Sequence, residues 1–283
     1  MTAAHTRDLV DDARRTGSAV LAFNVITLEH AEGIVAGLER AGSPGLLQIS
    51  ENAVRYRQGQ AGPLLAACRE LAAGATVPVA LHLDHLQDAD LLSDGVASAA
   101  RYGVTSVMVD AAHLGYDENV ATTAAVARSA HAAGLWVEAE LGEVGGKDGA
   151  HAPGVRTDPG QAAAFVAATG VDGLAVAVGS SHAMTTATAR LDLDLIARLA
   201  AAVPVPLVLH GSSGVPAAVL QDAVRAGIRK INIGTALNVA LTAEVRSALA
   251  ADDRLTDPRR YLAPGREAVA AVVAALCATI HAA

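Results

Sequence analysis

The chain has 283 residues, a formal net charge of −8 at pH 7 and a sequence pI near 5.6. This acidic balance argues against a nucleic-acid or anionic-membrane surface, so we expect a small-molecule partner. No run of 18 uncharged apolar residues is present, and the N-terminal stretch carries charges in place of an apolar signal segment. We therefore expect a cytoplasmic protein, with Cys68 and Cys277 as small buried side chains rather than a disulfide.

Short β-rich runs alternate with Ala-rich helical stretches along the whole chain, and no Pro/Gly/Ser-rich linker divides it. This pattern predicts repeated βα units, a parallel sheet and one domain over residues 1–283. The predicted strands span residues 20–23, 46–49, 79–83, 106–109, 135–139, 174–178, 207–209 and 230–233. Eight parallel strands predict a (β/α)8 TIM barrel, for which about 250 residues is typical. From Asp257 onward we expect an additional C-terminal helix, with an apolar face that packs on the barrel or on a neighbouring subunit.

A polar side chain follows every predicted strand. These residues are Asn24, Ser50, Asp84 with His85, Asp110, Glu140, His182, His210 and Asn232. In a (β/α)8 barrel the carboxyl ends of the strands meet at one rim, which carries the active site. The sequence therefore predicts a functional site at this rim.

Three of the ten histidines, His85, His182 and His210, come just beyond apolar strands at the predicted rim. Three neutral imidazoles with one open position are typical of a catalytic zinc site. His82 could instead be a histidine of the barrel interior. The remaining helical and terminal histidines, for which we expect solvated positions, are His5, His30, His131 and His281.

Glycine-containing turns follow the last two predicted strands, in the stretches HGSSGVP and NIGTAL, and both open helices. Gly211 and Gly214 allow the backbone to approach a ligand closely, and the free N–H groups at a helix start favour an anion. The loops after strands seven and eight of such barrels commonly bind phosphate. We expect a phosphate group here.

Eight stretches together resemble a known family. AFNVITLEH, LHLDH, SVMVDAAHLGYDENV, VEAELGEVGGKDG, TGVDGLAVAVGSSH, VPLVLHGSSGVP, KINIGTAL and DPRRYL are similar, in order, to motifs of the class II zinc-dependent ketose-bisphosphate aldolases. The likeness covers residues 22–261. It implies reversible cleavage of a ketose 1,6-bisphosphate, of fructose or tagatose type, to dihydroxyacetone phosphate and an aldehyde phosphate. It also implies an enediolate stabilised by zinc, and a homodimer or homotetramer.

The resemblance also implies roles for single residues. His85, His182 and His210 would bind one Zn2+, and Asp84 would be the acid/base on the substrate's C4 oxygen. Asp110 and Glu140 would lie behind the metal ligands or offer an alternative metal position. The substrate- and phosphate-binding positions, where Na+ or K+ is also common, would be Asn24, Ser50, Gly179, Gly211, Ser213, Asn232, Gly234 and Thr235. Arg259 would bind the distal phosphate of a partner subunit's substrate.

The sequence departs from the family's pattern in four places. The stretch KDG puts Asp148 where a proton-shuttling glutamate is expected. The loop through residue 159 is shorter than usual, and the segment 86–99 is longer. Ala183 and Met184 follow His182 in place of the frequent glycine and aromatic residue. All four differences concern substrate fit, so the resemblance implies the reaction class more strongly than the substrate.

Other functions are compatible with parts of the sequence. A Schiff-base aldolase needs a nucleophilic lysine; only Lys147, in the loop, and Lys230, expected to begin strand eight at the end away from the site, are present. A metal-dependent hydrolase would leave the two phosphate-type turns unexplained. An aldolase for another phosphorylated ketose, or a non-catalytic sugar-phosphate-binding barrel, remains open until turnover is assayed.

Overall fold

The computed structural model describes residues 4–142 and 155–281 of the chain. Eight parallel strands form a closed barrel in chain order, with β1 also pairing with β8. They are β1 (Val20–Asn24), β2 (Gly45–Ser50), β3 (Val79–Leu86), β4 (Val104–Val109), β5 (Trp136–Leu141), β6 (Gly173–Val176), β7 (Leu207–Leu209) and β8 (Ile228–Ile233). The predicted TIM barrel is confirmed, and each predicted strand is found: β7 has the predicted bounds, and the others differ by one to three residues at one or both ends.

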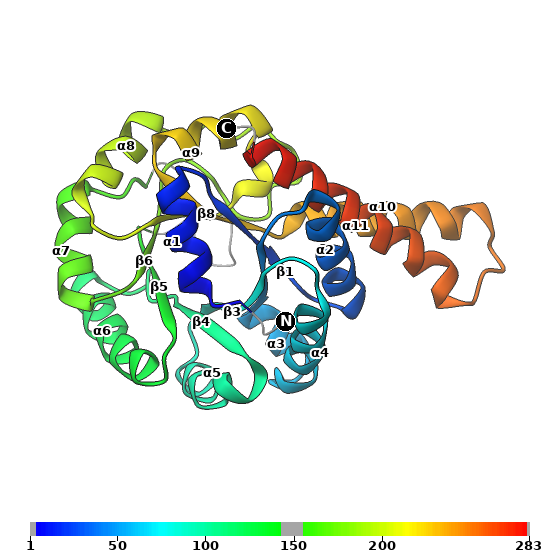
Figure 1. Cartoon of the computed structure of the whole chain (residues 1–283), viewed down its shortest axis with the longest axis horizontal. Helices are drawn as coiled ribbons and strands as arrows, with labels where there is room; N and C mark the ends of the chain where they lie inside the picture. Colours follow the sequence, from blue (N-terminus) through cyan, green and yellow to red (C-terminus); the bar gives the residue numbers. More distant parts are fainter. Residues whose placement is uncertain (1–3, 143–154, 282–283) are drawn as a thin grey trace.

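Helices pack around this barrel, and most of them form an outer ring (Figure 1). They are α1 (Thr6–Thr16), α2 (Leu28–Ala41), α3 (Glu51–Tyr56), α4 (Gly62–Gly74), α5 (Ala89–Tyr102), α6 (Tyr116–Ala132), α7 (Pro159–Thr169), α8 (Leu193–Ala202), α9 (Ala217–Ala226), α10 (Thr235–Ala251) and α11 (Pro258–His281). A 3-10 turn, Ser212–Gly214, follows β7. Most of the apolar core lies between the strands and this ring of helices.

The barrel interior changes from apolar to polar along the strands. Strand β5 is an example, because Trp136, Glu138 and Glu140 alternate along it and all three are buried. Side chains two residues apart on a strand share a face, so these three occupy successive interior layers. The apolar side chains of the interior form one cluster, which consists of Val20, Ala22, Leu46, Ala80, Met108, Trp136, Ala175 and Val208. The polar layers lie toward the carboxyl end.

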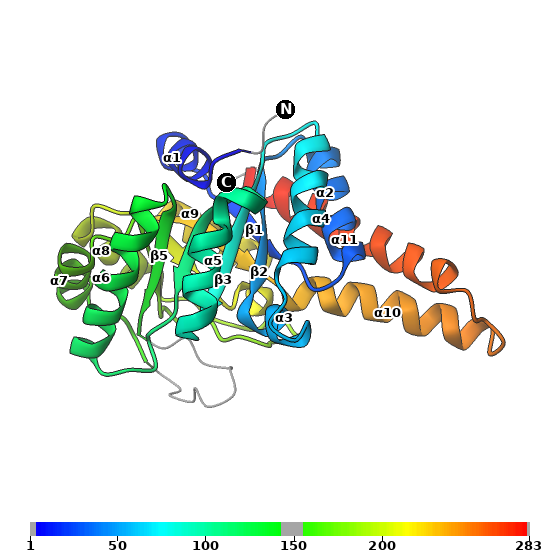
Figure 2. The same ribbon diagram turned by 90° about the horizontal axis from the view of Figure 1, so that it is seen from below.

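Helix α1 covers the amino-terminal mouth of the barrel. Its Leu9 and Val10 belong to the same buried cluster as the apolar interior layer. The Thr6 hydroxyl also forms a hydrogen bond with the Ser106 hydroxyl, 2.7 Å away and inside the barrel. Figure 2 shows α1 at one end of the barrel and α3 toward the opposite end. The amino-terminal mouth is therefore packed, and a ligand must enter from the carboxyl side.

Helices α10 and α11 form a hairpin that projects beyond the ring (Figures 1 and 2). The predicted C-terminal helix is thus confirmed. The inner part of α11 packs closely on α2, because a Cβ added at Gly33 would lie 2.9 Å from the Val269 Cβ atom. An ion pair between Arg40 and Glu267 joins the same two helices. Within the described residues, α11 is the one helix whose length and composition match a membrane span.

One histidine lies elsewhere than expected. We predicted a solvated position for His30, but it is 3 % exposed on α2. Its ring contacts the Asn238 amide oxygen, 3.0 Å from Nε2, because α10 crosses over this end of α2. Burial lowers the pKa of His30, so the neutral ring is favoured. The periodicity of α2 alone could not show that α10 covers this face.

Candidate active site

A bulge in β3 brings two consecutive residues to the carboxyl-end mouth. Leu83 pairs with Val107 and Leu86 pairs with Val109, so between these two pairs β3 contains one residue more than β4. His85, inside the interval, has a left-handed backbone with φ of 51°. Simple alternation would turn Asp84 and His85 to opposite faces, whereas a bulge can re-aim one of them. Both side chains therefore contribute to the same site.

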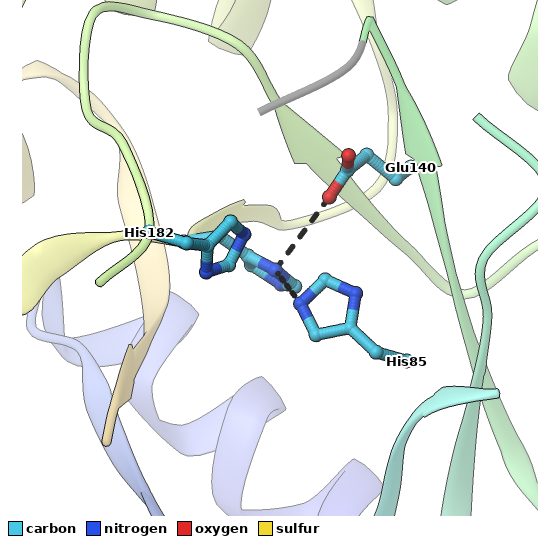
Figure 3. Close-up of side chains that lie close together, drawn as sticks. His85, Glu140 and His182 are labelled. Atoms are coloured by element: carbon cyan, nitrogen blue, oxygen red, sulfur yellow. Dashed lines mark hydrogen bonds and ion pairs between the residues drawn. The ribbon is translucent and has the colours of Figure 1, made fainter. Parts of the chain in front are cut away.

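Four side chains converge at this mouth: His85 from β3, Glu140 from β5, His182 from the loop after β6, and His210 directly after β7. Each offers one nitrogen or oxygen atom, and these atoms all lie within 4.8 Å of one another. Figure 3 shows His85, His182 and Glu140 directed toward a common centre. Three imidazoles with a carboxylate form a donor set that suits zinc. The residues present therefore fit a bound divalent metal ion.

His210 is the most enclosed member of this group and is fully buried. Its Nδ1 lies 2.7 Å from His85 Nε2 and faces the group, while its Nε2 lies 2.8 Å from a Glu138 carboxylate oxygen. Burial, together with the neighbouring His85, lowers the pKa of His210 to about 4. The imidazole is consequently neutral near pH 7, which is the state that coordinates a metal.

Glu138 and Lys230 form a buried ion pair directly beneath His210. The Lys230 Nζ atom lies 2.8 Å from Glu138 Oε2, and both side chains are fully buried. Lys230 also donates to the Asn232 side-chain oxygen at 2.6 Å. Burial opposes ionisation of Glu138, but Lys230 and His210 lower its pKa overall. Our placement of Lys230 at the far start of strand eight was wrong, because β8 begins at Ile228 and directs this lysine into the barrel.

Asp84 lies beside the group of His85, Glu140, His182 and His210, which we call the metal-type group. Two side-chain amides hold its carboxylate. Asn24 donates to one carboxylate oxygen at 2.9 Å, and Asn232 donates to the other at 3.3 Å. Gln48 in turn donates to the Asn24 side-chain oxygen at 2.9 Å. Burial raises the pKa of Asp84, but the charges of His85, His210 and other neighbours outweigh it and lower the value to about 2. Asp84 is thus an oriented, ionised carboxylate.

Asp110 supports His85 from behind. Its Oδ2 atom lies 2.9 Å from His85 Nδ1 and also accepts a hydrogen bond from the Gln87 amide at 3.2 Å. A carboxylate on the outer nitrogen of an imidazole fixes the tautomer and the orientation of the ring. His85 Nε2 is therefore the nitrogen that faces the centre of the site.

The two glycine-containing turns lie next to each other at the same mouth. The Ser212 hydroxyl donates to the Asn232 carbonyl, and the Ser213 hydroxyl accepts from the Ala236 backbone N–H at 3.1 Å. Gly211 has φ of 65°, and a Cβ there would lie 2.6 Å from the Ser181 carbonyl oxygen. Only glycine allows this approach. Gly234 and Thr235 lie in the second turn, at the start of α10, and Gly179 lies beyond the end of β6.

Two predicted site residues stand apart from this arrangement, and Ser50 lies at its edge. Ser50 ends β2, pairs with Asp84 of β3 and caps α3, where its hydroxyl accepts from the Ala53 N–H at 3.4 Å. The Arg259 side chain is 89 % exposed, forms an ion pair with Asp257 and lies at the start of α11, where the chain arrives from α10. Within one chain it does not join the mouth. Asp148 lies outside the described residues.

Sequence reasoning missed the layer beneath the site. Glu138, Gln48 and Lys230 each precede a predicted rim residue by two positions, before Glu140, Ser50 and Asn232 respectively. Because side chains at i and i+2 share a strand face, this spacing places them inside the barrel. The i, i+2 spacing carries this signal, and a strand that is considered only as an apolar run before its rim residue does not reveal it.

The closed barrel, the cluster of imidazoles and a carboxylate, and the paired turns define a barrel enzyme with a site suited to a metal ion. The model of the family "Fructose-bisphosphate aldolase class-II" matches residues 4–283. The chain belongs to this family. It is a class II ketose-bisphosphate aldolase, and thus a carbon–carbon lyase.

Known aldolases are similar to this chain over nearly its whole length. The "Probable fructose-bisphosphate aldolase" of Bacillus subtilis is 40% identical over 266 residues, which cover 93% of this chain and 92% of that protein. The fructose-bisphosphate aldolase of Geobacillus stearothermophilus is 38% identical over 96% of this chain and 95% of its own. The crystal structure of the YdjI aldolase from Escherichia coli K12 superposes with a TM-score of 0.83 at 31% identity, covering 99% and 97% of the two chains.

Proposed function

We propose that this protein reversibly cleaves a ketose 1,6-bisphosphate, of fructose or tagatose type, to dihydroxyacetone phosphate and an aldehyde phosphate. The observation that carries the proposal is the meeting of His85, His182 and His210 beside the oriented carboxylate of Asp84. Relatives named fructose-bisphosphate aldolase support the sugar bisphosphate. An identity near 40% leaves the configuration at C4 open.

In this proposal one zinc ion is held by His85, His182 and His210, with Glu140 close enough to join them. When bound, zinc would act as a Lewis acid on the negative charge that cleavage leaves on the dihydroxyacetone-phosphate half. Asp84 accepts the C4 hydroxyl proton and returns it in the reverse direction. Asn24 and Asn232 keep its two oxygens aimed during this transfer. A general acid/base in such a position contributes about 10²–10⁴ in rate.

The triose phosphate is proposed to bind at the two glycine-containing turns. Gly211 and Ser213 belong to one turn, and Asn232, Gly234 and Thr235 belong to the other. The close contact between the turns and the start of α10 offers backbone N–H groups to an anion. Gly179 and Ser50 complete the proposed substrate positions, and a Na+ or K+ ion beside the phosphate remains a prediction.

Two further roles are assigned to residues beyond this mouth: binding of the distal phosphate, and proton transfer on the dihydroxyacetone-phosphate half. Arg259 on the projecting hairpin is proposed to reach the site of a partner subunit in a homodimer or homotetramer. Only Leu237 of the 17 residues of α10 is buried within one chain, which supports a partner on this surface. Asp148 is proposed to move a proton on the dihydroxyacetone-phosphate half. A cytoplasmic location stays a prediction.

A panel assay tests the proposal directly. Purified protein is incubated with fructose 1,6-bisphosphate, tagatose 1,6-bisphosphate, the corresponding monophosphates and other phosphorylated ketoses, and triose phosphate release is followed. We expect cleavage of one bisphosphate and a collapse of kcat/KM without the C1 phosphate. Cleavage of another phosphorylated ketose alone would correct the substrate, and no turnover with any of them would favour a non-catalytic sugar-phosphate-binding barrel. Borohydride inactivation with substrate would instead indicate a Schiff base.

A further inference from the structure

The strained backbone at His85 needs support from outside β3. Gln58, His85 and Ala183 are the non-glycine residues with positive φ in the described part of the chain. A left-handed backbone is unfavourable for a side chain such as histidine and persists only where the surroundings fix it. The bulge itself interrupts the pairing of β3 with β4 at this point. The residues that hold the following segment, 86–88, therefore decide where His85 lies.

Glu51 holds this segment. Its Oε2 atom accepts hydrogen bonds from the backbone N–H groups of Gln87 at 2.7 Å and Asp88 at 2.9 Å. Glu51 is 8 % exposed and belongs to α3, so the contact joins the end of β2 to the end of β3. Its other oxygen is fixed by Arg55 Nε at 2.8 Å. The carboxylate thus clamps the chain two and three residues after His85.

The same clamp reaches the His85 imidazole by a second route. The Gln87 side chain, whose backbone Glu51 fixes, donates to Asp110 Oδ2. That oxygen is the one that contacts His85 Nδ1. Glu51 therefore constrains both the backbone that carries the imidazole and the carboxylate that orients its ring. Hydrogen bonds of a carboxylate to backbone N–H groups are charge-assisted and stronger than neutral ones.

We propose that Glu51 is a positioning residue for the metal site: it holds the β3 bulge so that His85 Nε2 faces the ligand group. This inference rests on the proposed function, because it explains how His85, a proposed zinc ligand, is oriented. Glu51 does not touch the metal-type group, so it acts through His85. Carboxylates that support metal-ligating histidines typically change metal affinity by about 10–100-fold when they are removed.

The chain contains a matched control at the other end of the same strand. Glu39 accepts a hydrogen bond from the backbone N–H of Thr76 at 2.8 Å, in the loop that leads into β3. Glu39→Ala removes the same kind of contact, a carboxylate on a backbone N–H, without disturbing the bulge. A loss of metal affinity that comes only from a weakened β3 would appear in both variants.

The experiment measures the zinc dissociation constant of the full chain by chelator competition, together with kcat, KM and thermal stability. We expect Glu51→Ala to weaken zinc binding by about 10-fold or more and to lower kcat, with KM less affected. Glu51→Gln should recover most of the affinity, because its amide oxygen can still accept from both N–H groups. Glu39→Ala should bind zinc like the wild type.

Four results separate the possibilities. Wild-type affinity in a folded Glu51→Ala variant overturns the inference while leaving the proposed zinc site intact, as does an equal loss in Glu39→Ala. A wild-type protein that binds no zinc overturns the proposed function and the inference with it. If Glu51→Ala does not fold, Glu51→Asp replaces it, since its shorter side chain cannot reach both N–H groups. Unchanged zinc affinity in Glu51→Asp would then overturn the inference.

Discussion

The two mouths of this barrel are built from the same strands but have opposite chemistry. At the amino end, Trp136 and its apolar neighbours meet Leu9 and Val10 of α1. At the carboxyl end, Asp84 and His210 belong to a network of hydrogen bonds and ion pairs. The first mouth is filled by side chains, whereas the second leaves polar atoms directed at a common centre. Stability and chemistry are therefore assigned to different ends.

A charged layer separates these two regions. The Glu138–Lys230 pair is fully buried between the apolar mouth and the imidazoles. Buried charges of this kind are costly unless each is paired and hydrogen-bonded. Here they are paired, and each also contacts a site residue, His210 or Asn232. The polar site therefore extends one layer deeper into the barrel than the proposed metal-binding residues. Substitutions can test each layer separately.

Asp84→Asn should have the largest effect on activity. Because Asp84 is assigned to proton transfer and not to the ligand group, we expect kcat to fall by about 10²–10⁴ while zinc stays bound. Turnover and metal content, measured on the same preparation, check this. The exposed residue Asp94 on α5 offers the control Asp94→Asn, which should leave both unchanged. Loss of zinc in Asp84→Asn, or near-normal turnover, would show that the role is misassigned.

Trp136→Ala should have the largest effect on the opposite mouth. Trp136 is 1 % exposed, and a Cβ added at Gly173 would lie 2.4 Å from its ring, so the site is tightly filled. Removal of a buried Trp costs about 3–5 kcal/mol of unfolding free energy. Denaturant unfolding measures this loss, and zinc affinity of the folded fraction should remain that of the wild type. A weakened zinc affinity would contradict the separation of the two mouths.

Glu138→Leu should weaken zinc binding by about 10–100-fold, since His210 loses the carboxylate that orients its ring. The single variant also leaves Lys230 buried without its partner, which is strongly destabilising. In the double variant Glu138→Leu/Lys230→Met we expect stability to recover while zinc affinity stays low. Chelator competition and denaturant unfolding distinguish the two effects. If zinc affinity recovers together with stability in the double variant, the Glu138–Lys230 pair has a structural role only.

Ala183→Gly should have the smallest effect. Ala183 follows His182 with φ of 58°, a conformation that glycine adopts without strain. We expect a gain of at most about 1 kcal/mol in unfolding free energy, partly offset by the greater freedom of glycine in the unfolded chain. A rise in melting temperature, measured with and without a chelator, checks this. A fall would mean that the Ala183 methyl group makes a contact that outweighs the strain.

The barrel and the rim were predictable because apolar runs and their polar ends repeat eight times in the sequence. The three histidines and Asp84 stood out for the same reason, since each follows a strand that the sequence predicts. The deeper layer was recoverable from the i, i+2 spacing. Neither the bulge at His85 nor the clamp by Glu51 could be predicted, because both depend on contacts between strands that no local pattern records. The burial of His30 under α10 is of the same kind.

The central claim is that His85, His182 and His210 hold one catalytic zinc ion, and elemental analysis with cleavage assays tests it most directly. The measurement compares the wild type, a chelator-treated sample, each histidine-to-alanine variant and the control His131→Ala, whose ring contacts Asp172 on the outer surface. We predict one zinc per subunit in the wild type and in His131→Ala, loss of zinc and of cleavage in the three variants, and recovery of the chelated enzyme on adding zinc. Full cleavage by metal-free protein would contradict the account.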